Sequence, residues 1–360
     1  MTARERVVVT GVGVVSGAFT GGSPALGAWL LGPSGPAPAT GQGPIVDDGT
    51  LAAHVDATES RRLSRVSRLA VAAARLALTD AGLDGDTGLG LVVGTELGDL
   101  RSTMAFADGY LDRGPAGLSA LLFPSTVMNT MASATSIAVR AQQASLTLNA
   151  PDVAGELSVA RGAAAVASGR MSVALAGGVD ELAPDVASLV ERLGPRGDRR
   201  GEGATFVVLE SRAAAERRRA TILAEIAGWA WRSAPARPNG VGRGSDGRAV
   251  ASALSAAGCG AADLRWLYRS ASGDPARDRW EERVLTRALG ASLPSASLAT
   301  WLGRHSGLGA LRVAAAAWTA RSGLLPSDGG GSPAPVERGP GLVHGLARGG
   351  AHVALVVTAP

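Results

Sequence analysis

The chain has 360 residues, of which 46% are hydrophobic and 18% charged, and this composition predicts a compact globular protein with one large or two ordinary domains. Its 35 basic side chains, all arginine, exceed the 31 acidic ones by four, and they lack the clustering with aromatic residues that marks a nucleic-acid partner. The single cysteine excludes internal disulfides and multi-cysteine metal sites, and no apolar run is long enough for a signal peptide or membrane span, so we expect a cytoplasmic protein with neither a nucleic-acid nor a membrane partner.

The first part of the chain alternates strand and helix patterns. Short β-branched or apolar runs ended by glycine predict buried strands at 7–9, 91–94 and 173–178. Apolar residues at three- and four-residue spacing predict helices at 65–81, stopped by Gly82, and at 155–167. This alternation indicates an α/β fold.

A second round of the same pattern begins near Thr221. It continues with a strand at 264–268, a long apolar helix at 308–320 and a last strand at 353–357. The Pro-, Gly- and Ser-rich segments 232–246 and 327–341 are typical of surface loops. The chain therefore reads as two related halves, 1–218 and 219–360.

Three weak motifs do not predict a cofactor or a metal site. Gly11-Val12-Gly13 follows a strand but has Ser16 where the dinucleotide fingerprint has its third glycine, so we interpret it as a tight structural turn. The four histidines lack metal-ligand spacing. Cys259 has no cationic neighbour that would activate a thiol, and we interpret it as a buried or loop residue.

Three longer segments carry a family resemblance. They are VVVTGVGVVSG near the start, FPSTVMNTMASATSIA from Phe123, and LTLNAPDVAGELSVARGAAAVASGRMSVALAGGVD from Leu146. In this order they resemble the β-ketoacyl synthase family, nearly from end to end. The resemblance implies a thiolase-like α/β fold in which two related halves form α-β-α-β-α layers.

All three catalytic positions of that family are changed in this sequence. Asp152 stands where working members carry the acyl-bearing cysteine, and Ser270 stands where they have the first histidine. In GRHSGLGA, Arg304 occupies the second histidine position, although a shift of one residue would place His305 there. The gating loop is reduced to Arg348-Gly349-Gly350, with Arg348 in place of its phenylalanine.

The altered motifs are similar to those of chain-length factors, the non-catalytic subunits of type II polyketide synthases. Those subunits commonly have glutamine at the position of Asp152, so the aspartate departs from their pattern. We hypothesise that Asp152 and Arg304 form an ion pair in the former catalytic pocket, with Ser270 as a further hydrogen-bonding group. The alternative is that Asp152 caps its helix and Arg304 reaches solvent.

The resemblance also implies partners. Members of this fold pair through the strand before the nucleophile position, so we expect a complex with a catalytic β-ketoacyl synthase subunit and a role beside an acyl carrier protein that holds the growing polyketide. The residues expected to line the acyl tunnel and set chain length are Leu97, Leu100, Met104, Leu122, Phe123 and Met128. The modest side chains at the first three positions favour a long or linear, reduced product.

Two other classes of function stay open at this stage. The first is an enzyme in its own right, a divergent synthase, acyltransferase or hydrolase, which would use His305 with Asp152 or Ser270. The second is a structural homodimer without a tunnel. Acyl labelling of the isolated chain would identify the enzyme, and stability without any partner would identify the homodimer.

Overall fold

The computed structural model describes residues 5–32, 43–83, 88–193, 199–328 and 331–360. The strands are β1 (Val7–Ser16), β2 (Thr20–Gly21), β3 (Leu89–Thr95), β4 (Ser145–Asn149), β5 (Val173–Asp180), β6 (Gly203–Ser211), β7 (Ala224–Ser233), β8 (Trp266–Tyr268), β9 (Ser295–Ala296), β10 (Leu324–Leu325), β11 (Ala334–Pro335), β12 (Gly341–Leu346) and β13 (Ala351–Thr358). The helices are α1 (Ser23–Leu31), α2 (Asp48–Ala52), α3 (Ala57–Ser60), α4 (Arg65–Ala81), α5 (Leu100–Arg113), α6 (Thr130–Ala138), α7 (Ala154–Ala167), α8 (Pro184–Leu193), α9 (Arg212–Arg217), α10 (Arg248–Ala257), α11 (Pro275–Leu289), α12 (Ala299–Leu302) and α13 (Ser306–Ser322). Three short 3-10 turns, η1 (Gly114–Gly117), η2 (Phe123–Thr126) and η3 (Ala261–Asp263), complete the described elements.

The two halves of the chain repeat one strand arrangement. In the first half, β4, β3 and β5 are parallel neighbours, and β6 and then β1 follow antiparallel. In the second half, β9, β8 and β12 are parallel, and β13 and then β7 follow antiparallel. The halves join where Val7–Val9 of β1 pair with β7. This repeat supports the division at residue 218, which stays a prediction.

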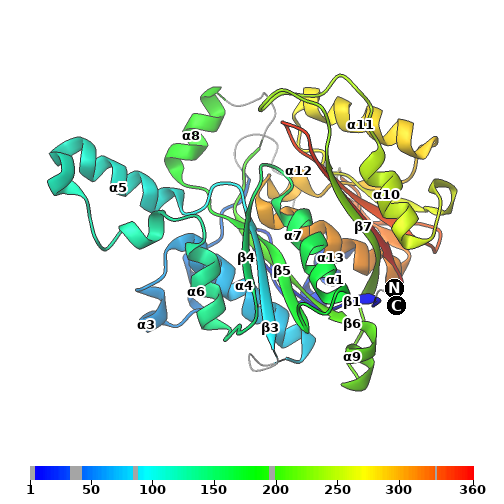
Figure 1. The fold of residues 1–360 in the computed structure, drawn as a ribbon, viewed down its shortest axis with the longest axis horizontal. Coiled ribbons are helices and arrows are strands. Elements are labelled where there is room, and N and C mark those ends of the chain that lie inside the picture. Colours follow the sequence, from blue (N-terminus) through cyan, green and yellow to red (C-terminus); the bar gives the residue numbers. More distant parts are fainter. Residues whose placement is uncertain (1–4, 33–42, 84–87, 194–198, 329–330) are drawn as a thin grey trace.

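The layers alternate α-β-α-β-α, as the resemblance implied (Figure 1). Helices α7 and α13 pack against each other and contact strands of both halves, so they form the central layer. Helix α4 covers the outer face of the first half of the sheet, and α10 covers that of the second half. The central layer is apolar and dense: α13 contains a run from Val313 to Ala317 that is fully buried.

Most predicted elements lie where the sequence placed them. Helix α4 ends at Ala81, and Gly82 follows in the left-handed conformation with φ of 63°. The strand predicted at 7–9 is longer, because β1 continues to Ser16 through a register shift between Val9 and Gly11. Segments 232–246 and 327–341 are mostly loops, although β7 ends at Ser233 and β11 lies within the second segment.

The interpretation of Gly11-Val12-Gly13 as a tight turn is wrong. Both glycines lie inside β1, beneath helix α4. A β-carbon on Gly13 would come 2.0 Å from the carbonyl oxygen of Ala73, and one on Gly11 would come 2.4 Å from that of Ala77. The glycines therefore let α4 approach the strand closely, and no phosphate-binding turn exists at this position.

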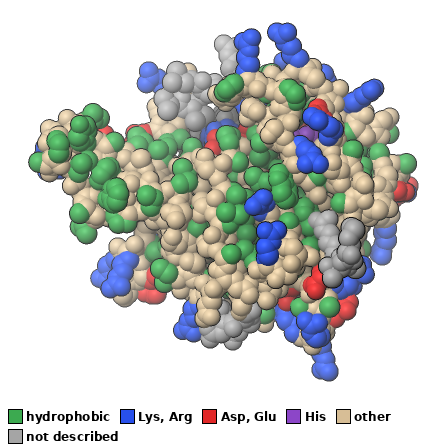
Figure 2. Space-filling model, in the orientation of Figure 1, with side chains coloured by type: hydrophobic (Ala, Val, Ile, Leu, Met, Phe, Trp, Pro, Cys, Tyr) green, Lys and Arg blue, Asp and Glu red, His purple; other side chains and the backbone are tan. Residues whose placement is uncertain are grey.

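One segment projects from the body of the molecule. Helix α5, η1 and η2 extend sideways from the end of β3, and no residue of α5 is buried (Figure 1). Apolar side chains gather on this projection (Figure 2). The large ones that are exposed there and in the following α6 are Tyr110, Leu111, Leu118, Leu121, Phe123, Val127, Met128 and Ile137. Such a patch is unusual for a monomer and marks an interaction surface.

Candidate functional site

Asp152 lies in the sharp turn between β4 and α7. Its φ of 61° is left-handed, which is uncommon for a residue with a β-carbon. The turn holds the side chain at the head of the central layer, where it is 5% exposed. The strand–turn–helix order is the local geometry that α/β-hydrolase enzymes use to present a nucleophile.

Arg304 reaches the same point from the second half of the chain. It lies between α12 and α13, and its backbone is anchored to the segment before β6: its N–H donates to Arg199 and its carbonyl accepts from Gly201, at 2.6 and 3.2 Å. From this anchored backbone the side chain extends into the site, where it is 12% exposed.

The predicted ion pair between Asp152 and Arg304 is confirmed. Nη1 of Arg304 donates to Oδ1 of Asp152 and also to Oε2 of Glu96, the latter at 2.9 Å. The other oxygen of Glu96 accepts from Nη2 of Arg200 at 2.8 Å. The four groups form a chain of alternating charge, in which each partly buried guanidinium has a carboxylate partner.

The second oxygen of Asp152 is also engaged. Oδ2 accepts from the backbone N–H of Arg348 at 3.2 Å, and Nε of Arg277 lies 4.0 Å away. Asp152 does not cap α7, because the cap position is Val153 and no side chain bonds there. The alternative reading of Asp152 as a helix cap and of Arg304 as solvent-exposed is therefore wrong.

Ser270 does not contact Asp152 or Arg304, contrary to the expected third member of the pair. Its hydroxyl donates to Glu281 at 2.7 Å and accepts from Nη2 of Arg277 at 2.6 Å and from the N–H of Leu346 at 3.1 Å. Ser270 is 3% exposed. Arg277 thus stands between the serine and Asp152, because its long side chain enters from α11 to fill the space between them.

A buried relay continues behind Ser270. Glu281 contacts Nδ1 of His344 at 2.7 Å, and Nε2 of His344 contacts Nε2 of His352 at 2.7 Å. Burial alone would raise the pKa of Glu281, but the hydrogen bond with His344 and the nearby Arg277 outweigh it and lower that pKa to about 2. Burial and the charge of His344 lower the pKa of His352 to about 3.

The remnant of the gating loop lies directly over Asp152. Besides its backbone contact, Arg348 donates from Nε to Oδ2 of Asp274 at 2.6 Å. Burial opposes ionisation of Asp274, yet the bond from Arg348 keeps its pKa below the ordinary value. Gly349 and Gly350 have φ of 83° and 96°, and a β-carbon on Gly350 would come 2.0 Å from the carbonyl oxygen of Ala234. The loop is therefore pinned across the site.

His305 points elsewhere. It precedes the first turn of α13, is 5% exposed, and neither ring nitrogen has a hydrogen-bond partner among the described residues. Burial lowers its pKa to about 4, against the opposing charges of Asp180 and Glu202. The described contacts of Asp152 are made by Arg304, Arg348 and Arg277 and do not include His305.

Sequence reasoning missed Glu96, Arg200 and Arg277. Glu96 carried a usable signal, since it is a charged residue directly after the buried strand β3, at the carboxyl end where α/β proteins build their sites. Nothing in the sequence distinguishes Arg277 and Arg200 from the other arginines of the chain. The structure brings Asp152, Arg304 and Arg348 together, whereas the side chain of Arg277 separates Ser270 from Asp152.

The six expected tunnel residues lie on the connection after β3 and on the projecting segment. Leu97, Leu100, Met104 and Leu122 are half-buried, whereas Phe123 and Met128 are 58% and 43% exposed. The rings of Phe106 and Phe123 are in contact, with centroids 6.1 Å apart. Within the described residues none of these six side chains is fully buried, so their role in a tunnel stays a prediction.

Strand β4 has an edge to which a strand of another chain could pair. It is the outermost strand of its half, pairing only with β3 within the described residues, and its five residues are half-buried or exposed. An uncovered strand edge is a template for pairing with another chain. Helix α6, which carries the exposed Ile137, packs beside β4.

Other candidate chemistries find no support in the described residues. No group of three His, Cys, Asp or Glu side chains within them could hold a metal ion. Burial raises the pKa of the Cys259 thiol, which disfavours a reactive thiolate. No described helix is long and apolar enough to cross a membrane.

Known proteins share both the sequence pattern and the fold. Residues 34–215 match the family model described as Beta-ketoacyl synthase, N-terminal domain. The Tetracenomycin polyketide synthase ketoacyl synthase beta subunit of Streptomyces glaucescens is 30% identical, over 93% of this chain and 90% of that protein.

Two solved structures resemble the fold over 99% of this chain and 100% of theirs. The ishigamide ketosynthase/chain length factor matches with a TM-score of 0.88 and 24% identity. A type II PKS acyl-carrier protein in complex with its ketosynthase bound to the hexaketide, AntDE:AntF, contains a chain that matches with a TM-score of 0.80 and 19% identity. These likenesses establish the thiolase-like architecture.

Proposed function

This chain belongs to the β-ketoacyl synthase family, and we propose that it is the chain-length-factor subunit of a type II polyketide synthase, without condensing activity of its own. In this role it pairs with a catalytic β-ketoacyl synthase subunit, which holds the acyl chain and receives the acyl carrier protein. The proposal extends to this chain what the names of its relatives say of those proteins.

The observation that carries the proposal is the state of the former nucleophile position. A condensing enzyme needs a nucleophile that takes up the acyl group and later releases it. It also needs hydrogen-bond donors that stabilise the oxyanion. Asp152 instead offers a carboxylate bonded to Arg304 through one oxygen and to the Arg348 backbone through the other. An acyl group on it would be a labile anhydride, and the site provides no imidazole beside it.

The reading of an enzyme that uses His305 receives no support from the geometry. Neither ring nitrogen of His305 has a hydrogen-bond partner within the described residues, and the Ser270 hydroxyl is hydrogen-bonded to Glu281 and Arg277. A serine nucleophile needs a base that accepts its proton and an exposed oxygen for the substrate. Ser270 is buried, and its hydroxyl donates to the carboxylate of Glu281, which also contacts His344.

The surface of the chain supports a partner. The β4 edge would extend the sheet into the neighbouring subunit, and the apolar patch on α5, η2 and α6 would be covered in the same contact. Leu97, Leu100 and Met104 would then face the growing chain from one side. Product length would be set by how far the acyl chain extends before it meets these side chains.

The test is co-expression with a catalytic β-ketoacyl synthase subunit of a type II polyketide synthase, followed by size-exclusion chromatography with mass determination and a malonyl-carrier condensation assay. We expect a one-to-one complex that extends chains only when both subunits are present. A homodimer of this chain alone that condenses or hydrolyses thioesters would overturn the proposal. A stable, inactive homodimer that does not bind the synthase subunit would also overturn it and would establish a purely structural role.

A matched pair of variants locates the contact. Leu121 is 91% exposed, so Leu121→Asp removes no buried contact from the isolated chain and should leave its melting temperature unchanged. Placed in an interface core, the same carboxylate should weaken the complex by at least about tenfold. Leu31→Asp is the control, because Leu31 is 55% exposed at the end of α1, away from β4. Equal effects of the two substitutions would argue against this interface.

A further inference from the structure

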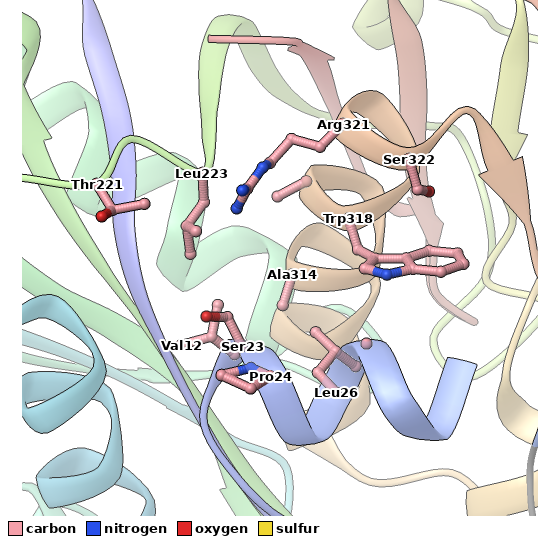
Figure 3. A pocket seen from close by; sticks show the side chains of 12 residues that line it. Val12, Ser23, Pro24, Leu26, Thr221, Leu223, Ala314, Trp318, Arg321 and Ser322 are labelled. Atoms are coloured by element: carbon pink, nitrogen blue, oxygen red, sulfur yellow. The ribbon is translucent and has the colours of Figure 1, made fainter. Parts of the chain in front are cut away.

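A cavity lies at the opposite end of the central layer from Asp152. Its volume is about 570 Å³, and it opens between α1, the last turns of α13, β1 and the segment before β7 (Figure 3). Helix α13 starts beside Arg304 and carries Arg321 near its end, so its 17 residues separate the two sites by about 25 Å. The cavity is therefore distinct from the Asp152 site, and its existence does not depend on the proposed function.

The cavity has an apolar base and a polar mouth. The base consists of buried side chains, each at most 4% exposed: Val12, Leu26, Leu223, Ala314 and Ala317. The mouth carries Thr221, Arg321 and Ser322, all of them exposed. Figure 3 shows the Arg321 side chain extending from α13 over the opening, toward Leu223. A size of this order with few polar groups is typical of small-molecule sites.

The charge of Arg321 at the mouth has no partner among the residues that the structure describes. Arg321 forms no ion pair or hydrogen bond with any described residue, whereas many arginines of the chain are paired with carboxylates. Asp80 lies behind the cavity wall, but its oxygens accept from the N–H and hydroxyl of Ser23, at 3.0 and 2.9 Å, and from the N–H of Val12, at 2.9 Å. The guanidinium thus faces an apolar hollow with its donors unused.

We propose that this cavity binds a linear carboxylate, a free fatty acid of medium length, with its alkyl chain on the apolar base and its carboxylate on Arg321. Thr221 lies across the opening from α13, on the side toward which Arg321 extends, and its hydroxyl can donate to the carboxylate. A guanidinium binds a carboxylate through two parallel N–H···O bonds, and the buried aliphatic wall removes the chain from water.

The site stays open in a complex formed through β4. Val12 lies on β1, which is four strands away from β4 within the first half of the sheet, or about 19 Å. A partner that adds to the β4 edge therefore leaves the cavity accessible. Binding can be measured on the isolated chain and on the complex alike.

The experiment is isothermal titration calorimetry with decanoate, kept below its micelle concentration, and with decanol as the uncharged chain of the same length. We expect one decanoate per chain and at least about tenfold weaker binding of decanol. Arg321→Glu should weaken decanoate by at least about tenfold without affecting decanol. The matched control is Arg279→Glu, since Arg279 is exposed on α11, outside the cavity.

Two further variants test the position of the alkyl chain. Ala317→Leu fills the base, and Thr221→Trp covers the mouth from an exposed position, which keeps the test valid if the buried substitution unfolds the chain. Both should weaken decanoate and decanol together. Absence of saturable decanoate binding, equal affinities for decanoate and decanol, or binding that ignores both Arg321→Glu and Thr221→Trp would each overturn the proposal.

Discussion

The carboxylate of Asp152 and the guanidinium of Arg304 meet although 151 residues separate them in the chain. Each comes from the loop before one of the two central helices, α7 and α13, which are equivalent elements of the repeated halves. The pocket that the fold forms between these helix starts is therefore closed by its own side chains. Glu96 and Arg200 extend the closure toward the base of α5.

Restoring a cysteine should not restore catalysis. In Asp152→Cys the thiol would regain the elbow position, but Ser270 and Arg304 supply no imidazole, and Arg277 and Arg348 still occupy the site. We expect slow acyl labelling from a carrier thioester, seen as an added mass on the intact protein, and no carbon–carbon bond formation from malonyl carrier. Condensation by this variant alone would contradict the closed-site interpretation.

Larger side chains at the base of α5 should shorten the product of the complex. Leu100→Trp and Met104→Trp add bulk at half-buried positions beside the expected tunnel. The product distribution, measured by mass spectrometry of released polyketides, should shift by one or more extension units. Ala107→Trp, at an exposed position of the same helix, should leave product length unchanged. Unaltered products from both tunnel variants would remove α5 from the chain-length mechanism.

Removing one partner of the buried pair between Glu156 and Arg312 should destabilise the central layer. Nη1 of Arg312 donates to Oε1 of Glu156 at 2.8 Å, with side chains 3% and 0% exposed. Glu156→Ala leaves the guanidinium buried without a partner and should lower the free energy of unfolding by about 3–5 kcal/mol.

Urea unfolding provides that measurement. The double variant Glu156→Met with Arg312→Met should recover most of the loss, because it leaves no buried charge. Glu337→Ala, which breaks the exposed pair with Arg265, should change the unfolding free energy by less than about 1 kcal/mol. A double variant less stable than Glu156→Ala alone would show that the pair contributes net stability.

Stability should decrease as the pH falls from about 6.5 to 4.5. Burial lowers the pKa of His305 to about 4 and that of His352 to about 3 in the folded chain. The unfolded chain, in which histidine titrates near 6.5, binds more protons in this range, so acid favours unfolding by at most about 1.4 kcal/mol per pH unit for each histidine.

The variant His305→Met isolates one of the two contributions. The His305 ring nitrogens have no hydrogen-bond partner among the described residues, so the substitution should preserve stability at pH 7 while reducing the pH slope by about half. Urea unfolding at several pH values between 4.5 and 6.5 measures that slope. An unchanged slope would place the acid sensitivity at other groups.

The order of strands and helices could be predicted from the sequence because it depends on local patterns. Periodic apolar residues predicted α4, with Gly82 as its stop, and a long apolar run predicted α13; the alternation of strands and helices predicted an α/β fold. The motif resemblance placed Asp152 and Arg304 at two altered catalytic positions that face each other across one pocket. Their opposite charges, together with the cost of burying either one alone, then predicted the pair.

Only the tertiary structure decided which other side chains share the site and which face solvent. Arg277 extends from α11 to Ser270, to the carbonyl of Leu346 in β12 and toward Asp152, and no local pattern encodes these contacts. Phe123 and Met128 are apolar, yet they are exposed, because the segment that carries them projects from the body of the chain. The cavity under Arg321 likewise exists only where α1, α13 and β1 meet. Periodicity records which face of an element is buried, whereas contacts between distant segments depend on how the whole chain packs.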